Sequence, residues 1–164
     1  MDKELEHQFV TNLETNQNIV HKICRIYTND QAAHNDLFQE ITIQLWKAYP
    51  KFRGDAKFST WMYRVALNTA ITLYRKKKRG IQTTDYDSVH FRIQAEEYDG
   101  EAEKQLTLLY SAVKELNDID KALVFLYLED KNYKEISETL GISEVNARVK
   151  MNRVKTKLKK ILNP

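Results

Sequence analysis

Hydrophobic residues recur every three or four positions along most of this chain, a spacing that places them on one face of an α-helix. Three such stripes occupy the first eighty residues: Ile19, Val20, Ile23, Cys24 and Tyr27; Leu37, Phe38, Ile41, Leu45, Trp46 and Tyr49; and Phe58, Met62, Val65, Ala66 and Ile71. The pattern therefore predicts three amphipathic helices in this half of the chain.

Local signals predict where these helices begin and end. Thr28 and Asn29 are expected to end the first helix and to cap the second. Pro50 is expected to end the second helix, because the residue before a proline disfavours helical dihedral angles. Residues 51–57 then form a loop, and Ser59 is the candidate N-cap of the third helix.

The second half of the chain returns to the helical period after a break. Residues 81–104 show no clear period and are rich in acidic residues, which predicts a linker. Beyond them, Asn117 or Asp118 can cap a helix. Two further hydrophobic stripes are Leu106, Leu109, Val113 and Leu116, and Ala147, Met151, Val154, Leu158 and Ile161. We expect an all-α chain of two small helical domains, residues 1–80 and 105–164, joined by the acidic linker.

Residues 132–143 have the pattern of a helix-turn-helix, in which a tight turn joins a short helix to a second one. Ile136 and Leu140 are expected to point inward. Gly141 can adopt the left-handed backbone of the turn without strain, and Ser143 can cap the second helix. The alternative interpretation is an ordinary helical hairpin with a charged surface.

The outward face of that second helix carries residue types that contact DNA. Arginine can hydrogen-bond to guanine edges and asparagine to adenine edges, while valine methyls can contact the thymine methyl group. Lysines suit phosphates. The candidate residues are Ser143, Val145, Asn146, Arg148, Val149, Lys150, Asn152, Arg153 and Lys155.

The net charge of +3 is distributed unevenly, with +5 over residues 1–80, −5 over residues 81–105 and +3 over residues 106–164. Basic residues gather along residues 148–160 and in the run Arg75-Lys76-Lys77-Lys78-Arg79. Clusters of this kind favour a polyanion partner, most often nucleic acid. One run taken alone is equally well explained as a solvated face.

Composition excludes several classes of protein. The 4 glycines and 2 prolines argue against low-complexity and strand-rich chains, and 42% hydrophobic residues argue against wholesale disorder. No apolar run approaches the roughly 18 residues that a membrane span needs, so we expect no membrane insertion. The acidic N-terminus lacks a signal core and the single cysteine fits a reducing compartment, so we expect the cytoplasm.

No catalytic or cofactor motif is evident in the sequence. It contains no glycine-rich phosphate loop, no zinc-spaced set of Cys and His, and no nucleophile elbow. His21 and Cys24 lie three residues apart, but no further metal ligand is near them in the sequence. We therefore expect neither an enzyme nor a bound metal or cofactor.

Residues 36–40, Asp-Leu-Phe-Gln-Glu, are followed by Trp46. Residues 58–68, Phe-Ser-Thr-Trp-Met-Tyr-Arg-Val-Ala-Leu-Asn, lead into the basic run. Both segments resemble region 2 of bacterial sigma factors. Residues 116–158 look like region 4 of the same family, with Tyr-Lys-Glu-Ile and Leu-Gly-Ile-Ser in place. The two lobes and short linker are similar to extracytoplasmic-function (ECF) sigma factors, which lack regions 1.1 and 3.

The resemblance implies roles for residues of the N-terminal lobe. The family docks on core RNA polymerase with the helix that here carries Asp36, Leu37, Gln39 and Glu40. It opens the minus-ten promoter element and tracks phosphates with the segment that here holds Phe58, Trp61, Arg64, Asn68, Arg75, Lys76, Lys77, Lys78 and Arg79. The alternatives without a function are a solvated polar face for the helix that carries Asp36 and Glu40, and a core position for Trp61.

The C-terminal lobe would bind the minus-thirty-five element, but its second helix departs from the family pattern. Asn146 and Ala147 stand where the family commonly has Thr-Val, and Val145 stands where it often has glycine. The resemblance therefore implies no particular promoter sequence. In the family the linker threads polymerase channels, although a plain solvated tether explains the acidic residues here equally well.

The resemblance thus implies an ECF-type sigma factor whose partners are core RNA polymerase, promoter DNA and an anti-sigma factor, which in the family is usually membrane-anchored. Two alternatives use less of the chain. A stand-alone helix-turn-helix regulator would leave the motifs of the first half without a role. A helical protein-interaction module would leave the basic runs unexplained.

Overall fold

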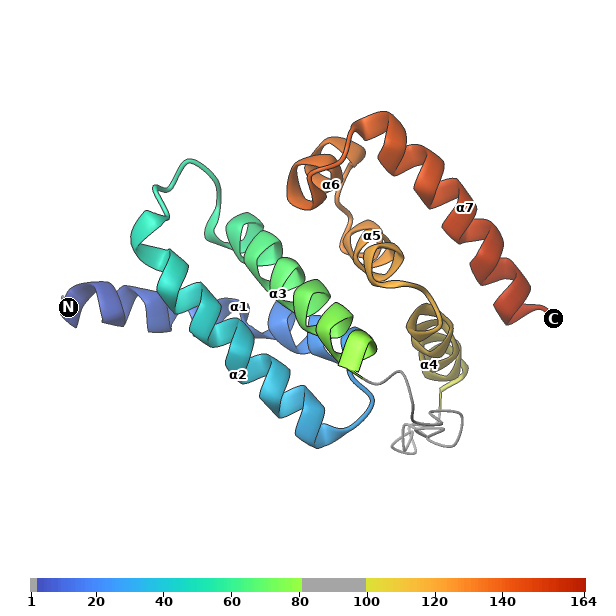
Figure 1. Cartoon of the computed structure of the whole chain (residues 1–164), viewed down its shortest axis with the longest axis horizontal. Coiled ribbons are helices and arrows are strands. Elements are labelled where there is room, and N and C mark those ends of the chain that lie inside the picture. The colour runs from blue at the N-terminus through green and yellow to red at the C-terminus, as the bar shows by residue number, and fades with distance from the viewer. Residues whose placement is uncertain (1–2, 81–99) are drawn as a thin grey trace. The chain divides into compact units, whose positions relative to one another are not determined.

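The computed structural model describes residues 3–80 and 100–164, and within them every regular element is a helix (Figure 1). This confirms the expected all-α class. The chain separates into two compact units, Met1–Leu73 and Tyr74–Pro164. Their boundary falls inside a helix, before the predicted domain end at residue 80. Residues 81–99, most of the predicted linker, lie outside the described residues.

The first unit is built from helices α1 (Lys3–Tyr27), α2 (Gln31–Ala48) and most of α3 (Phe58–Gly80). A short 3-10 helix, η1 (Tyr49–Lys51), contains Pro50 and follows α2 directly. Helix α1 packs along α2. The core is largely apolar and includes Val20, Ile23, Cys24, Ile26, Leu37, Ile41, Leu45, Met62, Ala66, Leu67 and Ala70.

Two predicted helix boundaries in this unit are wrong. Asp30 rather than Asn29 caps α2, and its carboxylate accepts a hydrogen bond from the Ala33 N–H at 2.7 Å. Helix α3 begins at Phe58, so Ser59 lies within its first turn and is not the N-cap. Aspartate and asparagine cap helices about equally well, so the residue type alone could not decide between Asp30 and Asn29.

Burial on α3 is broader than the predicted stripe. Tyr63, Leu67 and Ala70 are buried together with the expected Met62, Ala66 and Ile71. Phe58 and Val65, also predicted to face inward, are only half-buried. Helical spacing places these six buried positions on one side of α3.

The second unit contains α4 (Glu101–Lys114), α5 (Asp118–Leu128), α6 (Tyr133–Leu140) and α7 (Glu144–Leu162). Residues 101–104 were expected to belong to the linker but form the first turn of α4. Helices α4, α5 and α6 all pack against α7. The shared core is Ala112, Val113, Leu116, Ala122, Leu123, Leu126, Ile136, Ala147, Met151, Val154 and Leu158.

Helix α5 is fixed at its start by two polar contacts. The N-cap is Asn117, one of the two predicted candidates, and its side chain accepts a hydrogen bond from the Asp120 N–H at 2.8 Å. The carboxylate of Asp120 in turn forms an ion pair with Lys157 of α7, at 3.5 Å. The first turn of α5 is therefore tied both to its own backbone and to the last helix.

A pair of histidines joins α1 to α2. His21 Nδ1 lies 3.0 Å from His34 Nε2, and the His21 ring also stacks on Phe38 with ring centroids 4.5 Å apart. A hydrogen bond between two imidazoles needs one donor and one acceptor, so the pair cannot keep it when both rings are protonated. Burial, together with the nearby His21 and Arg25, lowers the pKa of His34.

This pair predicts a loss of stability in mild acid. Because the pKa of His34 is lower in the folded chain, the unfolded chain takes up the proton first, and stability falls as the pH drops below the unfolded value of about 6.5. Between about pH 7.5 and about pH 5.5, the melting temperature measured by circular dichroism should fall more steeply for the wild type than for His34→Gln. His7→Gln, at an exposed position of α1, controls for loss of an imidazole in general. Equal slopes for the wild type and His34→Gln would contradict this prediction.

Candidate nucleic-acid interface

The structure contains the predicted helix-turn-helix, formed by α6, residues 141–143 and α7. Gly141 has φ +71° and ψ +30°, the left-handed conformation expected for the turn. The N–H groups of Gly141 and Ile142 both donate to the Ser137 carbonyl, at 2.9 and 3.2 Å. The Ser143 Oγ accepts a hydrogen bond from the Asn146 N–H at 3.0 Å. These hydrogen bonds satisfy the backbone at both sides of the turn.

The inward side of the motif anchors it in the core. Ile136 of α6 is fully buried, as are Ala147 and Met151 of α7 within a few per cent. Leu140, which was expected to point inward, is half-buried, and so is Ile142 of the turn. The rotation of α7 about its own axis is therefore set by the residues that it buries.

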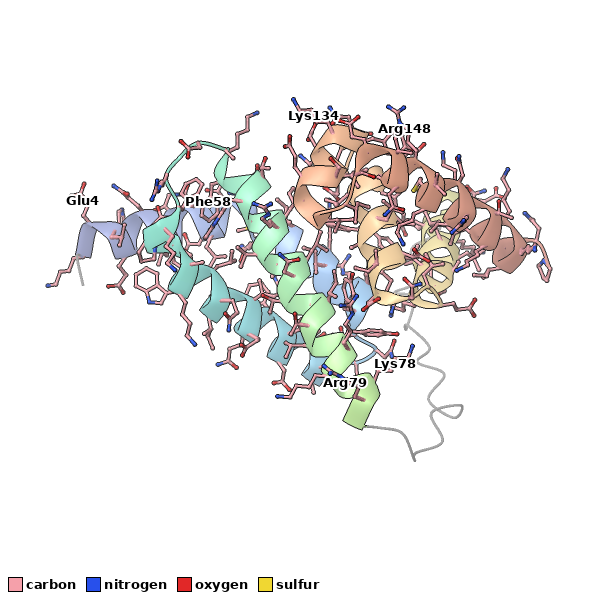
Figure 2. All side chains as sticks on the ribbon, turned by 45° about the horizontal axis from the view of Figure 1, so that its top comes forward. Glu4, Phe58, Lys78, Arg79, Lys134 and Arg148 are labelled. Carbon is pink, nitrogen blue, oxygen red and sulfur yellow. The ribbon has the colours of Figure 1, made fainter. Side chains whose placement is uncertain are left out.

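The opposite side of α7 faces solvent. Val145 is 71% exposed and Val149 is 43% exposed, although both are large apolar residues. Arg148 of α7 and Lys134 of α6 both project away from the ribbon (Figure 2). Of the other predicted DNA-contacting residues, Ser143, Asn146, Asn152 and Arg153 are exposed, and Lys150 and Lys155 are half-buried. Helical spacing of three and four residues groups Val145, Arg148, Val149 and Asn152 on one face, which we call the α7 outer face.

Two basic side chains near this face lie over aromatic rings. The Arg148 guanidinium carbon is 5.3 Å from the centroid of the Tyr133 ring of α6. Lys155 Nζ is 4.7 Å from the centroid of the Tyr127 ring of α5. Both distances are in the range of cation–π interactions. Sequence reasoning missed both tyrosines, because such pairs depend on how two helices cross, which periodicity does not determine.

The polar face of α2 is the candidate polymerase-docking face. Asp36 and Gln39 are exposed, and the half-buried Glu40 accepts a hydrogen bond from Gln44 Nε2 at 2.9 Å. Leu37 is only 6% exposed and belongs to the core stripe of α2, so its side chain is not part of this surface. Ile43 is 39% exposed and was missed, although its spacing of seven residues from Asp36 could have revealed it.

The candidate minus-ten segment begins in an aromatic cluster. The half-buried Trp61 ring lies 5.1 Å from Phe52, 5.4 Å from Phe58 and 6.1 Å from Tyr49, measured between centroids. These contacts tie η1 and the loop before α3 to the first turns of that helix. Trp61 thus packs against other aromatic rings of the first unit, while its side chain is only half-buried. Further along α3, Arg64 and Asn68 are exposed.

The basic run forms the end of α3. Lys76, Lys77, Lys78 and Arg79 are exposed, and Figure 2 labels the last two. Arg75 differs from them, because its guanidinium forms an ion pair with Asp118 of the same compact unit. Four adjacent cations therefore face solvent, whereas the fifth already has a carboxylate partner.

The described residues contain no group of three or more His, Cys, Asp and Glu that could hold a metal ion. Cys24 is fully buried, and burial raises the pKa of its thiol to about 12, so the side chain is a small neutral core residue. No helix in residues 3–80 or 100–164 is long and apolar enough to cross a membrane.

Comparison with known proteins accounts for both halves of the chain. Residues 13–80 match the family model of sigma-70 region 2, and residues 106–158 match that of sigma-70 region 4. RNA polymerase sigma factor SigZ of Bacillus subtilis is 32% identical over 135 residues, which cover 82% of this chain and 75% of that protein. ECF RNA polymerase sigma factor SigM of the same organism is 27% identical over 150 residues, covering 89% and 90%.

Two solved structures share the fold. Sigma factor RpoE, in complex with the anti-sigma factor NepR from Bartonella quintana, has a TM-score of 0.71 at 16% identity and covers 98% of both chains. CnrH, in complex with the cytosolic domain of CnrY, has a TM-score of 0.67 at 18% identity and covers 96% of this chain and 89% of that one. With both region models and the sequence relatives, the comparisons place the chain in the sigma-70 family. It is a sigma factor of the ECF type, and its function is promoter recognition.

Proposed function

We propose that this sigma factor docks on core RNA polymerase through Asp36, Gln39, Glu40 and Ile43 of α2. The three polar side chains and the exposed isoleucine lie three, four and seven residues apart, so they form one stripe along the helix. An apolar residue among hydrogen-bonding groups is typical of a protein interface, where the centre is desolvated and the rim stays polar.

The second part of the proposal concerns the promoter. The α7 outer face contacts base edges of the minus-thirty-five element, and Lys150, Arg153 and Lys155 contact phosphates. The single observation that carries it is the exposure of Val145, Arg148 and Val149 on a helix whose opposite side is fully buried. Exposed valines beside an arginine offer a methyl contact for thymine and a hydrogen-bond donor for guanine.

The third part concerns strand opening at the minus-ten element. Asn68 and Arg64 lie on the exposed side of α3, beyond an aromatic cluster that holds the preceding loop in place. An amide can hydrogen-bond to the exposed edge of an extruded base, and the four exposed cations at the end of α3 suit phosphates. The cluster around Trp61 makes this surface rigid before DNA binds.

An anti-sigma factor is the remaining proposed partner. The two solved structures compared above are complexes with a second protein, named as an anti-sigma factor in one and as a cytosolic domain in the other. A partner with a cytosolic domain supports a membrane-anchored regulator for this chain as well, and therefore a cytoplasmic location.

Run-off transcription with core RNA polymerase tests the proposal as a whole. Adding the chain should produce a transcript from its promoter, and omitting it should abolish that transcript. The rival stand-alone regulator predicts something different, namely tight DNA binding by the chain alone and no change in polymerase specificity.

The docking face predicts a defect in assembly. Replacing Asp36, Gln39 and Glu40 together by alanine should weaken binding to core polymerase by about 2 kcal/mol or more, roughly thirtyfold in Kd, as when desolvated interface groups are truncated. Fluorescence anisotropy of the labelled chain measures this. Gln31→Ala with Asn35→Ala, which removes a hydrogen-bonded pair beside this stripe, is the matched control. Unchanged binding of the triple variant would remove this face from the interface.

The α7 outer face predicts two kinds of defect in promoter binding. Arg148→Ala should cost about 1–3 kcal/mol on the cognate minus-thirty-five sequence and relax the preference at one base position. Lys155→Ala should weaken all sequences about equally and flatten the salt dependence. Holoenzyme binding to promoter variants at several salt concentrations distinguishes the two. If Arg148→Ala behaves like Lys155→Ala, then Arg148 contacts phosphate instead.

The exposed side of α3 predicts a defect in strand opening. Asn68→Ala should leave the closed complex nearly intact and reduce the open complex by about 1 kcal/mol, roughly fivefold, because one hydrogen bond to the extruded base is lost. Permanganate reactivity of promoter thymines with reconstituted holoenzyme measures this. Thr72→Ala, one turn further along the same side, is the control. Normal permanganate reactivity of the Asn68→Ala complex would show that the Asn68 amide does not contribute to strand opening.

A further inference from the structure

Arg148 on the α7 outer face is in contact with a side chain of another helix, the ring of Tyr133. We infer that Tyr133 is a positioning residue for promoter specificity, because its ring orders the Arg148 side chain before DNA binds. The inference rests on the proposed contact between Arg148 and a base. It assigns a role to a residue outside the helix that carries that contact.

The Tyr133 ring is held by the first turn of α6. Tyr133 directly follows the cap residue Asn132, whose side chain accepts a hydrogen bond from the Glu135 N–H at 2.8 Å. Three residues after Tyr133, Ile136 is fully buried in the core. Cap and core contact together fix the backbone from which the half-buried ring projects, so the ring is a rigid support for the guanidinium.

The interaction with the ring leaves the hydrogen-bonding capacity of Arg148 unused. An aromatic ring attracts a guanidinium through its π face, whereas the five N–H donors lie in the guanidinium plane. Among the described residues, no carboxylate lies within ion-pair distance of Arg148, and its contact is with the Tyr133 ring. The donors therefore remain available for a base edge, where a bidentate contact to guanine requires a defined orientation.

Ordering of this side chain affects specificity more than total affinity. A free arginine on an exposed helix can reach several acceptors, including phosphates, and must lose side-chain entropy on binding. An arginine held against Tyr133 has already lost part of that entropy and samples fewer positions. We therefore expect the ring to concentrate the contact of Arg148 on one base pair.

The pair Tyr127 and Lys155 offers a matched control. It has the same interaction between a cation and a ring, at 4.7 Å. Lys155, however, is proposed to contact phosphate, which carries no sequence information. Loss of the Tyr127 ring should therefore affect all promoter sequences alike.

The test uses the full chain assembled with core polymerase and a promoter library randomised across the minus-thirty-five element. Tyr133→Leu should relax the preference about three- to tenfold at the same base position as Arg148→Ala, whereas Tyr133→Phe should keep it. In an Arg148→Ala background, Tyr133→Leu should have no further effect on preference. Tyr127→Leu should lower binding to every sequence without changing the preference. Tyr133→Gln replaces the leucine variant if thermal melting shows that variant to be less stable.

Several outcomes would overturn the inference. Tyr133→Leu could keep the wild-type preference, or change it equally in the Arg148→Ala background, and either result would show that the ring does not act through Arg148. A relaxed preference in Tyr133→Phe would assign the role to the hydroxyl group instead of the ring. An Arg148→Ala variant with intact preference would overturn the proposed base contact itself. Relaxed preference in Arg148→Ala but not in the Tyr133 variants would overturn the positioning role alone.

Discussion

The burial of one side of α7 is the constraint on which the second unit depends. Ala147, Met151 and Val154 occupy the space between α4, α5 and α6, and the 3.6-residue period then leaves no choice about which residues face solvent. A shift of one residue would turn the helix by about 100° and would expose Met151 while burying charged groups. Stability of the core and presentation of the α7 outer face are thus two consequences of the same packing.

The first unit relies on a different interaction for the same purpose. Its exposed surface on α3 follows a loop, and a loop alone would not hold side chains in register. The contacts of Trp61 with Tyr49, Phe52 and Phe58 attach that loop to α2 and α3 through η1. Tilted and edge-on ring pairs contribute about 0.5–1.5 kcal/mol each beyond their buried area. Aromatic packing thus holds the loop before α3 in place, as the hydrogen bonds of the turn hold the helix-turn-helix.

Much of this architecture could be predicted from the sequence, because it follows from local rules. Helical periodicity gave the all-α class and the inward residues of α7, and the requirements of a left-handed turn gave Gly141. The N-cap at Ser143 and one of the two candidates at Asn117 follow equally from short-range hydrogen bonding. Predicting the buried stripe of α7 also predicted its outer face, since that face consists of the positions the stripe leaves exposed.

The features that could not be predicted depend on contacts between segments distant in the sequence. Asp30 and Asn29 are equivalent as caps until the path of the chain between α1 and α2 is known. Leu37 was assigned both to a core stripe and to a surface, and only the packing of α2 on α1 decides between them. The contacts of the Tyr127 and Tyr133 rings with Lys155 and Arg148 depend on how α5 and α6 pack against α7. Family resemblance supplied the partners, which no local pattern specifies.

Cys24 can report on local opening of the first unit, because its thiol is buried. It is the single cysteine of the chain, and its side chain is fully enclosed between α1 and its neighbours. A thiol reagent reacts with the ionised, accessible form, and both conditions require this region to open. The rate at which a thiol reagent labels Cys24 therefore measures how often the first unit opens, and no engineered probe is needed. The same enclosure shields the factor from oxidants as long as that unit stays closed.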